Sequence, residues 1–509
     1  MTTRVRRGAA CSSPRRLSSI FVVLVSVSAC HGAPPKIVPP PPSSTRVLEL
    51  QRTIDVLLAD PALELGTWGI LVKSLSRDDT LYALNQRKML MPASTLKVVT
   101  LAAAADRLGW DYTYQTRVFT IGTIEAGVLN GDLLIVGSGD PSLDDWDGAA
   151  TNLFDRWAAL LKEQGIRTIA GRVVGDDNAF DDAGLGAGWA WDDLGASYAT
   201  SVGALQYNEN TARVIVGPGS APGDPASVAT QPEAAQLTLR NLVRTVPAGA
   251  PASLQIRLLP LTSMLELRGA VQMDTTPFAR NTSVPNPTLY FANAVRLALT
   301  RNGIEVAGPA MDIDDLSDSP NPANGRLVTE ESSARLAQLA TTMMKLSQNL
   351  YAETLLKTLG ARAHGVGSSE EGCSVVRTTL EAWRIPTSDV LMVDGSGLSR
   401  YNLITPDALV GTLSHVYHDD RIRGSFVETL PLAGVDGTLA DRMKGTAAAG
   451  NARAKTGSFS NARAIAGYVR TANDEPLAFA ILANNYGVEP AVIDRASDAL
   501  VAALAQFSR

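Results

Sequence analysis

The segment from Pro92 to Leu108 constrains the fold of this chain more than any other part of the sequence. It is rich in alanine, leucine and valine, and its apolar residues surround the helix axis instead of forming one stripe. Proline near the start and Gly109 after the end are typical helix boundaries. Such a helix must be covered on all sides, so the sequence predicts a layered domain with this helix in its interior.

The order of the flanking patterns predicts that this α/β domain is interrupted. A helix and two strands precede the buried helix, and helices, a strand pair and a last helix close the chain. Between them, residues 112–273 carry short strand patterns separated by Gly, Asp and Pro turns. We therefore expect a discontinuous domain formed by residues 48–110 and 287–509, with β-rich inserted material at 111–286.

The first thirty residues have the pattern of an export signal. Five arginines between Arg4 and Arg16 precede an uncharged run, Leu17 to Ala29, that is too short for a comfortable membrane span. The run ends in Val-Ser-Ala-Cys30, which is similar to the box of bacterial lipoproteins, where the cysteine is lipidated. A plain signal peptide followed by an unrelated cysteine is the alternative. We expect residues 1–30 to be a lipoprotein signal peptide, with lipidation at Cys30.

The next segment, residues 31–47, is rich in proline, which favours an extended and semi-rigid linker. It would hold the domain away from a membrane to which lipid on Cys30 anchors it. The expected location is the cell envelope or periplasm, with the export route and the membrane left open. Cys373 is the other cysteine expected in the mature chain, so no intrachain disulfide framework is expected.

The charge and histidine content exclude several classes of function. The net charge is −6 and basic residues are scattered outside the N-terminus, which argues against nucleic-acid binding. None of the four histidines suggests a Ser-His-Asp triad. His415 and His418 fit a solvated helix end better than a metal site. No metal and no organic cofactor is expected.

Ser94-Thr-Leu-Lys97 places a hydroxyl and an amine three residues apart, on one face of the predicted buried helix. A serine hydroxyl is a weak nucleophile until a base removes its proton. Lysine can be that base only when neutral, so burial or a second cation must lower its pKa from about 10.4 by several units. Taken alone, this pair is more typical of a helix cap and a surface lysine.

Two later segments strengthen the interpretation of this pair. Ser347-Gln-Asn349 lies where two helical patterns meet, and either residue would also suit a helix cap. Lys455-Thr-Gly-Ser458 precedes the terminal strand pair, where a lysine-protected edge strand with a bulge is the simpler interpretation. Together and in this order, the segments match the Ser-x-x-Lys, Ser-x-Asn and Lys-Thr-Gly set of penicillin-recognising serine enzymes.

From about Leu48 to its C-terminus the chain resembles the penicillin-binding protein 4 type of D-alanyl-D-alanine carboxypeptidase/endopeptidase. Further similar segments are Gly137–Ser142, Trp189–Leu194, Asp394–Asn402 and Leu432–Leu439. The resemblance implies a transpeptidase/β-lactamase-like α/β (α+β) domain, with an antiparallel sheet flanked by helices and β-rich inserted domains. About 250 residues separate Lys97 from Ser347, which suits a family that carries extra domains in this gap.

The resemblance also implies roles for the motif residues. Ser94 would be the acylated nucleophile and Lys97 its base, while Ser347 would relay a proton to the leaving amine. Asn349 would orient the substrate. Lys455 would be the second cation that helps to keep Lys97 neutral and attracts the terminal carboxylate of the substrate.

The remaining implied site residues concern substrate binding. Thr456 and Ser458 would bind the terminal carboxylate, and Gly457 would let the peptide lie close along the strand. Backbone N–H groups of Ser94 and Ser458 would form an oxyanion hole. Asp176 would reach the site from the inserted region.

The function implied by the resemblance is that of a serine D-Ala-D-Ala carboxypeptidase, and also a DD-endopeptidase, acting on peptidoglycan stem peptides. β-Lactams would acylate the same serine and act as inhibitors. Two alternatives remain open at this point: a β-lactamase or esterase with the same motifs, and a non-catalytic wall-binding lipoprotein. The sequence also leaves open a homodimer, the balance between the two peptidase activities and the preferred third residue of the stem peptide.

Overall fold

The computed structural model describes residues 45–146, 148–259 and 262–509. The expected signal peptide, the expected lipid site at Cys30 and most of the expected linker therefore lie outside the described residues. No helix within the described ranges combines the length and hydropathy needed to cross a membrane.

The central element is a five-stranded sheet in which every neighbouring pair is antiparallel. Its order is β18-β19-β20-β1-β2, so β18 lies at one edge. The strands are β18 (Arg453–Phe459), β19 (Ala462–Arg470), β20 (Pro476–Asn484), β1 (Thr67–Ser74) and β2 (Thr80–Leu84). Because β1 pairs with β20 along its whole length, the two ends of the described chain meet in one sheet.

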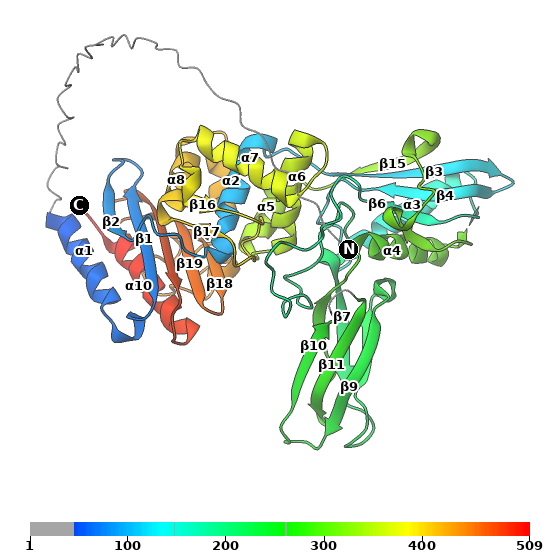
Figure 1. Ribbon diagram of the computed structural model, residues 1–509, viewed down its shortest axis with the longest axis horizontal. Coiled ribbons are helices and arrows are strands. Elements are labelled where there is room, and N and C mark those ends of the chain that lie inside the picture. The colour runs from blue at the N-terminus through cyan, green and yellow to red at the C-terminus, as the bar shows by residue number, and fades with distance from the viewer. Residues whose placement is uncertain (1–44, 147, 260–261) are drawn as a thin grey trace, which may run out of the picture. The chain divides into compact units, whose positions relative to one another are not determined.

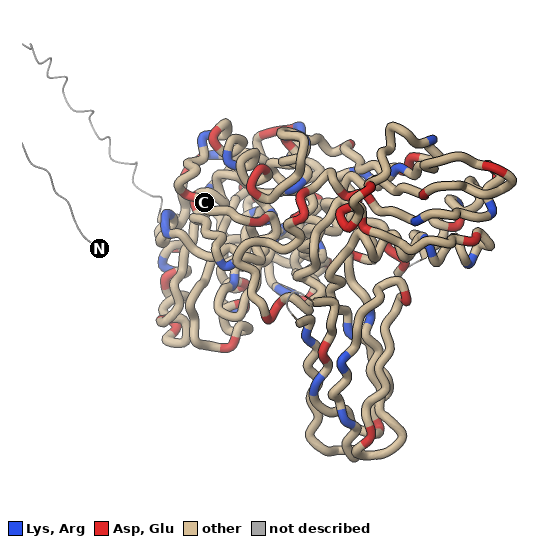
Figure 2. Tube along the Cα trace, turned by 45° about the vertical axis from the view of Figure 1, so that its right-hand side comes forward, with Lys and Arg blue, Asp and Glu red and all other residues tan. Residues whose placement is uncertain are grey.

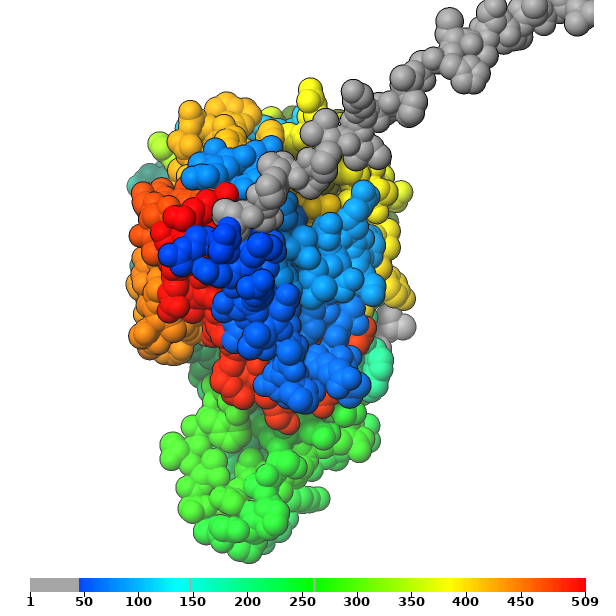
Figure 3. Space-filling view, turned by 90° about the vertical axis from the view of Figure 1, so that its left-hand side faces the viewer, coloured from blue at the N-terminus to red at the C-terminus, as the bar shows by residue number. Residues whose placement is uncertain are grey.

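Helices cover both faces of this sheet. On one face α1 (Thr45–Leu58) lies beside α10 (Pro490–Gln506), seen as blue and red side by side in Figure 3. The other face is covered by α2 (Lys97–Leu108), which is packed in turn against further helices (Figure 1). These are α5 (Leu336–Lys345), α6 (Asn349–His364), α7 (Ser369–Ala382), α8 (Pro406–His418) and α9 (Arg423–Thr429). The predicted antiparallel sheet flanked by helices is confirmed.

The sequence of α2 explains its position. All of its residues from Lys97 to Ala105 are buried, as expected for a helix that is apolar on nearly every face. Side chains along β19 point alternately to the two faces of the sheet. Ala464 and Ala466 face the α2 side, whereas Ile465 and Val469 face the α10 side. Small residues on the α2 side let α8 and the turn that leads into α2 contact β19 closely.

The inserted region begins after α2 and contains a seven-stranded sheet. Its strands are β3 (Gln115–Glu125), β4 (Val128–Val136), β5 (Thr168–Ile169), β6 (Val173–Asp176), β13 (Glu305–Val306), β14 (Ala310–Asp312) and β15 (Gly325–Ser332). Two helices, α3 (Ala149–Glu163) and α4 (Pro287–Arg301), pack on it through Phe154, Trp157 and Phe291. The insert is thus not only β-structure, and α3 was not predicted.

A second part of the insert consists of two three-stranded sheets packed together. One contains β7 (Thr211–Gly217), β8 (Ser227–Gln231) and β12 (Phe278–Ser283), and the other β9 (Thr238–Val246), β10 (Ser253–Leu258) and β11 (Met264–Gln272). Val214 and Val216 of the first sheet share a core with Leu265 and Leu267 of the second. Figure 1 shows strands of both sheets gathered in a lobe of their own.

The expected boundary at 286/287 requires a correction. Helix α4 shares a core with α3, and β15 pairs antiparallel with β3, so residues 287–332 pack with the inserted elements. The helices around α2 resume only at α5. A helical pattern at residue 287 indicates a helix but carries no information about which layer covers it, which is why the sequence placed this boundary too early.

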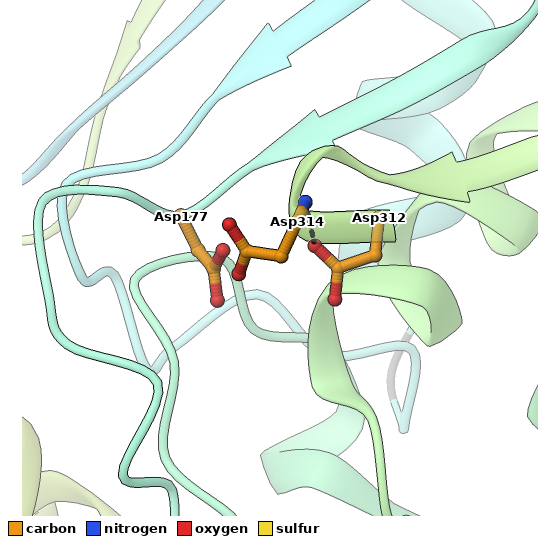
Figure 4. Close-up of side chains that lie close together, drawn as sticks. All are labelled: Asp177, Asp312 and Asp314. Carbon is orange, nitrogen blue, oxygen red and sulfur yellow. Dashed lines mark hydrogen bonds between the residues drawn. The ribbon is translucent and has the colours of Figure 1, made fainter. Parts of the chain in front are cut away.

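Three aspartates of the inserted region come together outside the five-stranded sheet (Figure 4). Oxygens of Asp177, Asp312 and Asp314 lie within 4.8 Å of one another. Asp177 accepts a hydrogen bond from Thr288 Oγ1 at 2.7 Å. Burial, followed by repulsion from Asp312 and Asp314, raises the pKa of Asp177 to about 6.

Replacing Asp177 by asparagine is expected to stabilise the protein at neutral pH. A carboxyl whose folded-state pKa is raised from 3.8 favours the folded state least above pH 6, where it must be charged. We expect a gain of about 1–3 kcal/mol in the free energy of unfolding at pH 7.5, vanishing below about pH 4. Urea denaturation at both pH values measures it, with exposed Asp192→Asn as the control. An equal gain at both pH values would contradict the electrostatic cause.

Candidate active site

Ser94 lies in a short 3-10 turn, Ala93–Leu96, that leads directly into α2. Thr95 closes this turn by donating its hydroxyl hydrogen to Pro92 O at 2.7 Å. Ala93 has a φ of +44°, a backbone conformation that non-glycine residues adopt only at a cost. Ser94 is half-buried while Lys97 is fully buried, so the turn presents the hydroxyl to the surface and hides the amine below it.

Two glycines from distant segments let this turn pack tightly. A Cβ at Gly457 of β18 would lie 2.5 Å from Pro92 O and 3.0 Å from Ser94 N. A Cβ at Gly397 would lie 2.0 Å from Ala93 O. The sequence led us to expect that Gly457 makes room for a peptide substrate, and the structure adds that it makes room for the Ser94 turn itself.

The Lys97 amine has three neighbours within hydrogen-bonding distance. Its Nζ lies 2.9 Å from Ser94 Oγ, 2.7 Å from Asn349 Oδ1 and 2.8 Å from Ser396 O. A neutral amine has two N–H bonds and one lone pair. Since Asn349 Oδ1 and Ser396 O can only accept, the two N–H bonds go to them and the lone pair is left for the Ser94 hydroxyl. This arrangement makes Lys97 a base aimed at Ser94.

Burial lowers the pKa of Lys97 to about 7, against the smaller opposing effects of Glu353 and Asp394. Burial, and next the charge of Lys97, lower the pKa of Lys455 well below its ordinary value. The sequence led us to expect that burial of the helix and a second cation together keep Lys97 neutral. In the structure, removal from water is the main cause at both lysines.

The Ser-x-Asn segment connects the two lysines. Ser347 precedes α6 with a φ of +60°, and its Oγ accepts a hydrogen bond from Lys455 Nζ at 2.8 Å. Lys455 Nζ also donates to Thr456 O at 2.8 Å. Asn349 begins α6, where its Nδ2 donates to Tyr198 O of the inserted region at 2.8 Å. The fold thus brings together all three motifs predicted from the sequence.

Glu353 is a structural member of the site that the sequence interpretation missed. Its carboxylate accepts hydrogen bonds from Gly395 N at 2.9 Å and Ser396 N at 2.7 Å. The carbonyl of Ser396 is a partner of Lys97, so Glu353 fixes the position of that acceptor. The available signal was spacing: Glu353 stands four residues after Asn349 in a helix that is buried from 349 to 360.

The segment from Asp394 to Asn402 forms a compact loop between two short paired strands, β16 (Val390–Leu391) and β17 (Leu403–Ile404). The buried carboxylate of Asp394 accepts hydrogen bonds from Gly397 N, Ser399 N and Asn402 Nδ2 at 2.6–2.8 Å. It also accepts one from Trp189 Nε1 of the inserted region at 3.0 Å. The loop that supports Lys97 is therefore held by both α6 and the insert.

A cleft of about 550 Å³ opens over Ser94. Its lining combines the Ser94 turn, the edge strand β18, the loop after Asp394 and two residues of the insert. The lining residues are Ala93, Ser94, Asp193, Tyr198, Ser347, Asn349, Gly397, Leu398, Arg400, Thr438, Thr456, Ser458, Phe459, Ser460 and Arg463. The Thr456 hydroxyl donates a hydrogen bond to Thr438 Oγ1 at 2.7 Å.

Asp176 does not line this cleft. It ends β6, is buried, and accepts hydrogen bonds from the backbone and side chain of Asn178. The insert reaches the cleft through Asp193 and Tyr198 instead. The expectation for Asp176 is thereby corrected: the insert does approach the site, but from the loop after β6. Figure 2 shows basic and acidic positions scattered along the trace of the described chain.

The rate of acylation is expected to follow the titration of Lys97. Because the amine acts as a base only when neutral, a pKa of about 7 predicts a rate that rises tenfold per pH unit below 7 and levels off above it. The second-order rate constant for acylation by a fluorescent penicillin, measured from pH 5 to 9, tests this. A rate that still rises steeply at pH 9 would show that Lys97 keeps an ordinary lysine pKa.

Comparisons of the whole sequence with known proteins point to one family. The sequence model of the D-Ala-D-Ala carboxypeptidase 3 (S13) family matches residues 50–507. A D-alanyl-D-alanine carboxypeptidase of Actinomadura sp. (strain R39) is 31% identical, over 99% of this chain and 93% of the relative. The D-alanyl-D-alanine carboxypeptidase DacB of Haemophilus influenzae is 27% identical, over 87% of this chain and 89% of the relative.

Solved structures of the relative from Haemophilus influenzae have the same fold as this chain. The crystal structure of penicillin binding protein 4 (dacB) from Haemophilus influenzae superposes with a TM-score of 0.78 at 26% sequence identity. It covers 91% of this chain and 99% of that one. The same protein complexed with a novel β-lactam gives a TM-score of 0.71 at 25% identity, covering 89% and 98%. These matches confirm the expected transpeptidase/β-lactamase-like domain with its insertions.

Proposed function

The chain belongs to the D-Ala-D-Ala carboxypeptidase 3 (S13) family, as a serine-type carboxypeptidase of the penicillin-binding protein 4 type, and on this basis we propose that Ser94 is its acylated nucleophile. The observation that carries the assignment is the contact of 2.9 Å between Ser94 Oγ and the buried amine of Lys97. Family membership sets aside the non-catalytic alternative.

In the proposed acylation step, Ser94 Oγ attacks the carbonyl carbon of the penultimate D-alanine while its proton passes to Lys97 Nζ. The oxyanion that forms is placed against the backbone N–H groups of Ser94 and Ser458, where one donor is typically worth about 3 kcal/mol. Asn349 holds Lys97 in position through its Oδ1 and contributes to the cleft wall.

The leaving amine must gain a proton when the C–N bond breaks. Ser347 Oγ lies in the cleft and accepts a hydrogen bond from Lys455 Nζ, so it can donate its own hydroxyl proton to the amine. Lys455 replaces that proton. D-Alanine departs, and exchange with water in the cleft removes the proton that Lys97 took from Ser94 and returns one to Lys455. Water then attacks the ester carbonyl and gives its proton to the neutral Lys97, which passes it to Ser94 Oγ as the shortened peptide is released.

The edge position of β18 supports the way in which a peptide would bind. Within the sheet the neighbour of β18 is β19, and on its other side Arg453 and Ala454 are already paired with Leu432 and Pro431. From Lys455 onward this side can offer backbone groups to an extended peptide. Thr456 and Ser458 line the cleft along this strand, where their hydroxyls can receive the terminal carboxylate. Asp193 and Arg400 bring charges of both signs to the lining, which suits a polar stem peptide.

We further propose that the enzyme cleaves D-alanyl cross-links as an endopeptidase. The bond broken is again an amide on the carbonyl of D-alanine, with a carboxylate on the carbon next to the leaving nitrogen, so the same residues serve. Digestion of purified cross-linked muropeptide dimers, beside uncross-linked pentapeptide monomers, tests both activities. We expect monomers from the first and free D-alanine from the second; intact dimers would contradict the endopeptidase proposal.

The β-lactamase alternative differs in the fate of the acyl-enzyme. A chromogenic cephalosporin should give a stoichiometric burst followed by slow hydrolysis if β-lactams act as inhibitors of this enzyme. Sustained rapid hydrolysis would favour the alternative. A β-lactam-bound relative of the same fold supports binding of this class of compound.

The location remains a proposal that rests on the sequence alone. Attachment of lipid to Cys30 at the end of an apolar signal, followed by the proline-rich linker, would place the enzyme in the cell envelope facing peptidoglycan. Detergent-phase partitioning of the expressed chain and its Cys30→Ala variant tests the anchor. Equal partitioning of the two into the aqueous phase would contradict it.

A further inference from the structure

Arg463 lines the cleft, although no motif of the sequence pointed to it. It lies on β19 directly opposite Ser458 of β18. Its Nη1 donates to Phe459 O and Ala462 O at the end of the β18–β19 hairpin. The buried Nε has no hydrogen-bond partner, and Nη2 makes no hydrogen bond with any of the described residues. Part of the guanidinium is therefore left without an acceptor beside the proposed substrate site.

One acid lies near this guanidinium but does not satisfy it. Asp494 of α10 is 3.5 Å from Arg463 Nε, without hydrogen-bond geometry. The other oxygen of Asp494 is 3.3 Å from Arg442 Nη1, and Arg442 is held more closely by Asp498 at 2.7 Å. Since Nε is buried beside Asp494 and Nη1 is bonded to two carbonyls, Nη2 is the donor left for an anion in the cleft.

The geometry of the strand pair decides what this anion is. Thr456 and Ser458 are two residues apart on β18, so their side chains lie on one face of the strand. Arg463, opposite Ser458 on β19, lies on that same face, and all three line the cleft. The charged guanidinium can donate a hydrogen bond from its free Nη2 to a carboxylate on this face.

We propose that Arg463 binds the carboxylate of the leaving residue, together with the hydroxyls of Thr456 and Ser458, and thereby sets the preference for substrates with a free carboxylate at this position. The inference rests on the proposed function, in which Ser94 cleaves the amide next to that carboxylate. It also changes the role expected for Lys455. That lysine is fully buried, bonded to Ser347 and Thr456 O, and has a lowered pKa, whereas an arginine stays charged at every relevant pH.

The test compares one peptide in two forms, a diacylated Lys-D-Ala-D-Ala with a free C-terminal carboxylate and its C-terminal amide. For the wild type we expect the free acid to be strongly preferred. In Arg463→Gln, kcat/KM for the acid should fall by about 10- to 100-fold while that for the amide changes little. Arg463→Lys should recover part of the preference, because it restores the charge without the planar fork.

Arg442→Gln is the matched control, since Arg442 shares Asp494 with Arg463 but does not line the cleft. It should leave the ratio of acid to amide turnover as in the wild type. Equal losses for acid and amide in Arg463→Gln, or an equal change of the ratio in Arg442→Gln, would show that Arg463 only supports the fold. Labelling of the wild type by fluorescent penicillin separates the role of Arg463 from the proposed function. If the wild type is labelled and Arg463→Gln keeps the preference for the acid, only the role of Arg463 is overturned. If the wild type is not labelled, the proposed function is overturned as well.

Discussion

Replacing Ser94 by alanine is expected to abolish labelling by fluorescent penicillin and to lower D-alanine release by at least about 10⁴-fold. Ser94 Oγ is the only hydroxyl within hydrogen-bonding distance of Lys97 Nζ among the described residues, so no neighbouring serine can take its place. The fold should survive, because the lost atom is half-exposed and Lys97 keeps Asn349 Oδ1 and Ser396 O as partners. Intact-protein mass spectrometry after exposure to penicillin measures the loss of the adduct.

The control for this variant is Ser319→Ala, which removes another serine hydroxyl from a loop of the inserted region. Ser319 bonds only to carbonyls of its own loop, Ile313 O and Leu316 O. It should be labelled like the wild type and release D-alanine at the same rate. A penicillin adduct that persists in Ser94→Ala would identify a different nucleophile and would overturn the proposed mechanism, while leaving family membership untouched.

The sequence predicted those parts of the site for which the pattern of a single segment also meets a chemical requirement of the reaction. The helix after Pro92 is apolar on nearly every face, and such a helix must be covered on all sides. The sequence therefore predicted that Lys97 is buried. Burial in turn lowers the pKa of Lys97 to about 7, which the chemistry of a lysine base requires. The spacing of Ser94 and Lys97 needed no tertiary information.

The parts that the sequence did not predict depend on contacts between distant segments. Glu353 acts through the backbone of Ser396, and backbone positions leave no residue-type signal. Arg463 reaches the cleft only because β19 pairs with β18 in one particular register. Asp176 was assigned by analogy of sequence alone, and its side chain is satisfied locally by Asn178. Long-range packing decided the cases of Glu353 and Arg463, whereas a local contact decided that of Asp176.

In the fold, too, some features could be predicted from one segment and others only from contacts between distant segments. The helical spacing of Ala150, Phe154, Trp157 and Leu161 was a readable signal for α3, which the many strand patterns around it obscured. The boundary after the insert was different, because the pattern of α4 is that of an ordinary helix. Only the hydrophobic core that α4 shares with α3 shows that α4 belongs to the inserted region.

Replacing Gly397 by alanine is expected to slow acylation by about 100-fold or more without unfolding the protein. Gly397 has a φ of +83°, which disfavours any side chain, and the new Cβ would lie 2.0 Å from Ala93 O. Ala93 precedes Ser94, so relief of this clash must shift the turn that carries the nucleophile. Misplacement of a reacting group by about 1 Å can cost about 100-fold in rate. The second-order rate constant for penicillin acylation measures the effect.

The matched control is Gly445→Ala, which has the same kind of backbone strain without the clash. Gly445 has a φ of +74° and a Cβ there would have no neighbour within 4 Å. The strained backbone should cost each variant stability on the order of 1 kcal/mol, and the clash should cost Gly397→Ala more. Only Gly397→Ala should lose acylation. If the two variants are acylated at equal rates, the loop after Asp394 does not position Ser94, and its contact with Ala93 is packing without consequence for the reaction. A Gly397→Ala enzyme that is folded but slowly acylated would instead show that the loop acts on catalysis through the placement of one turn.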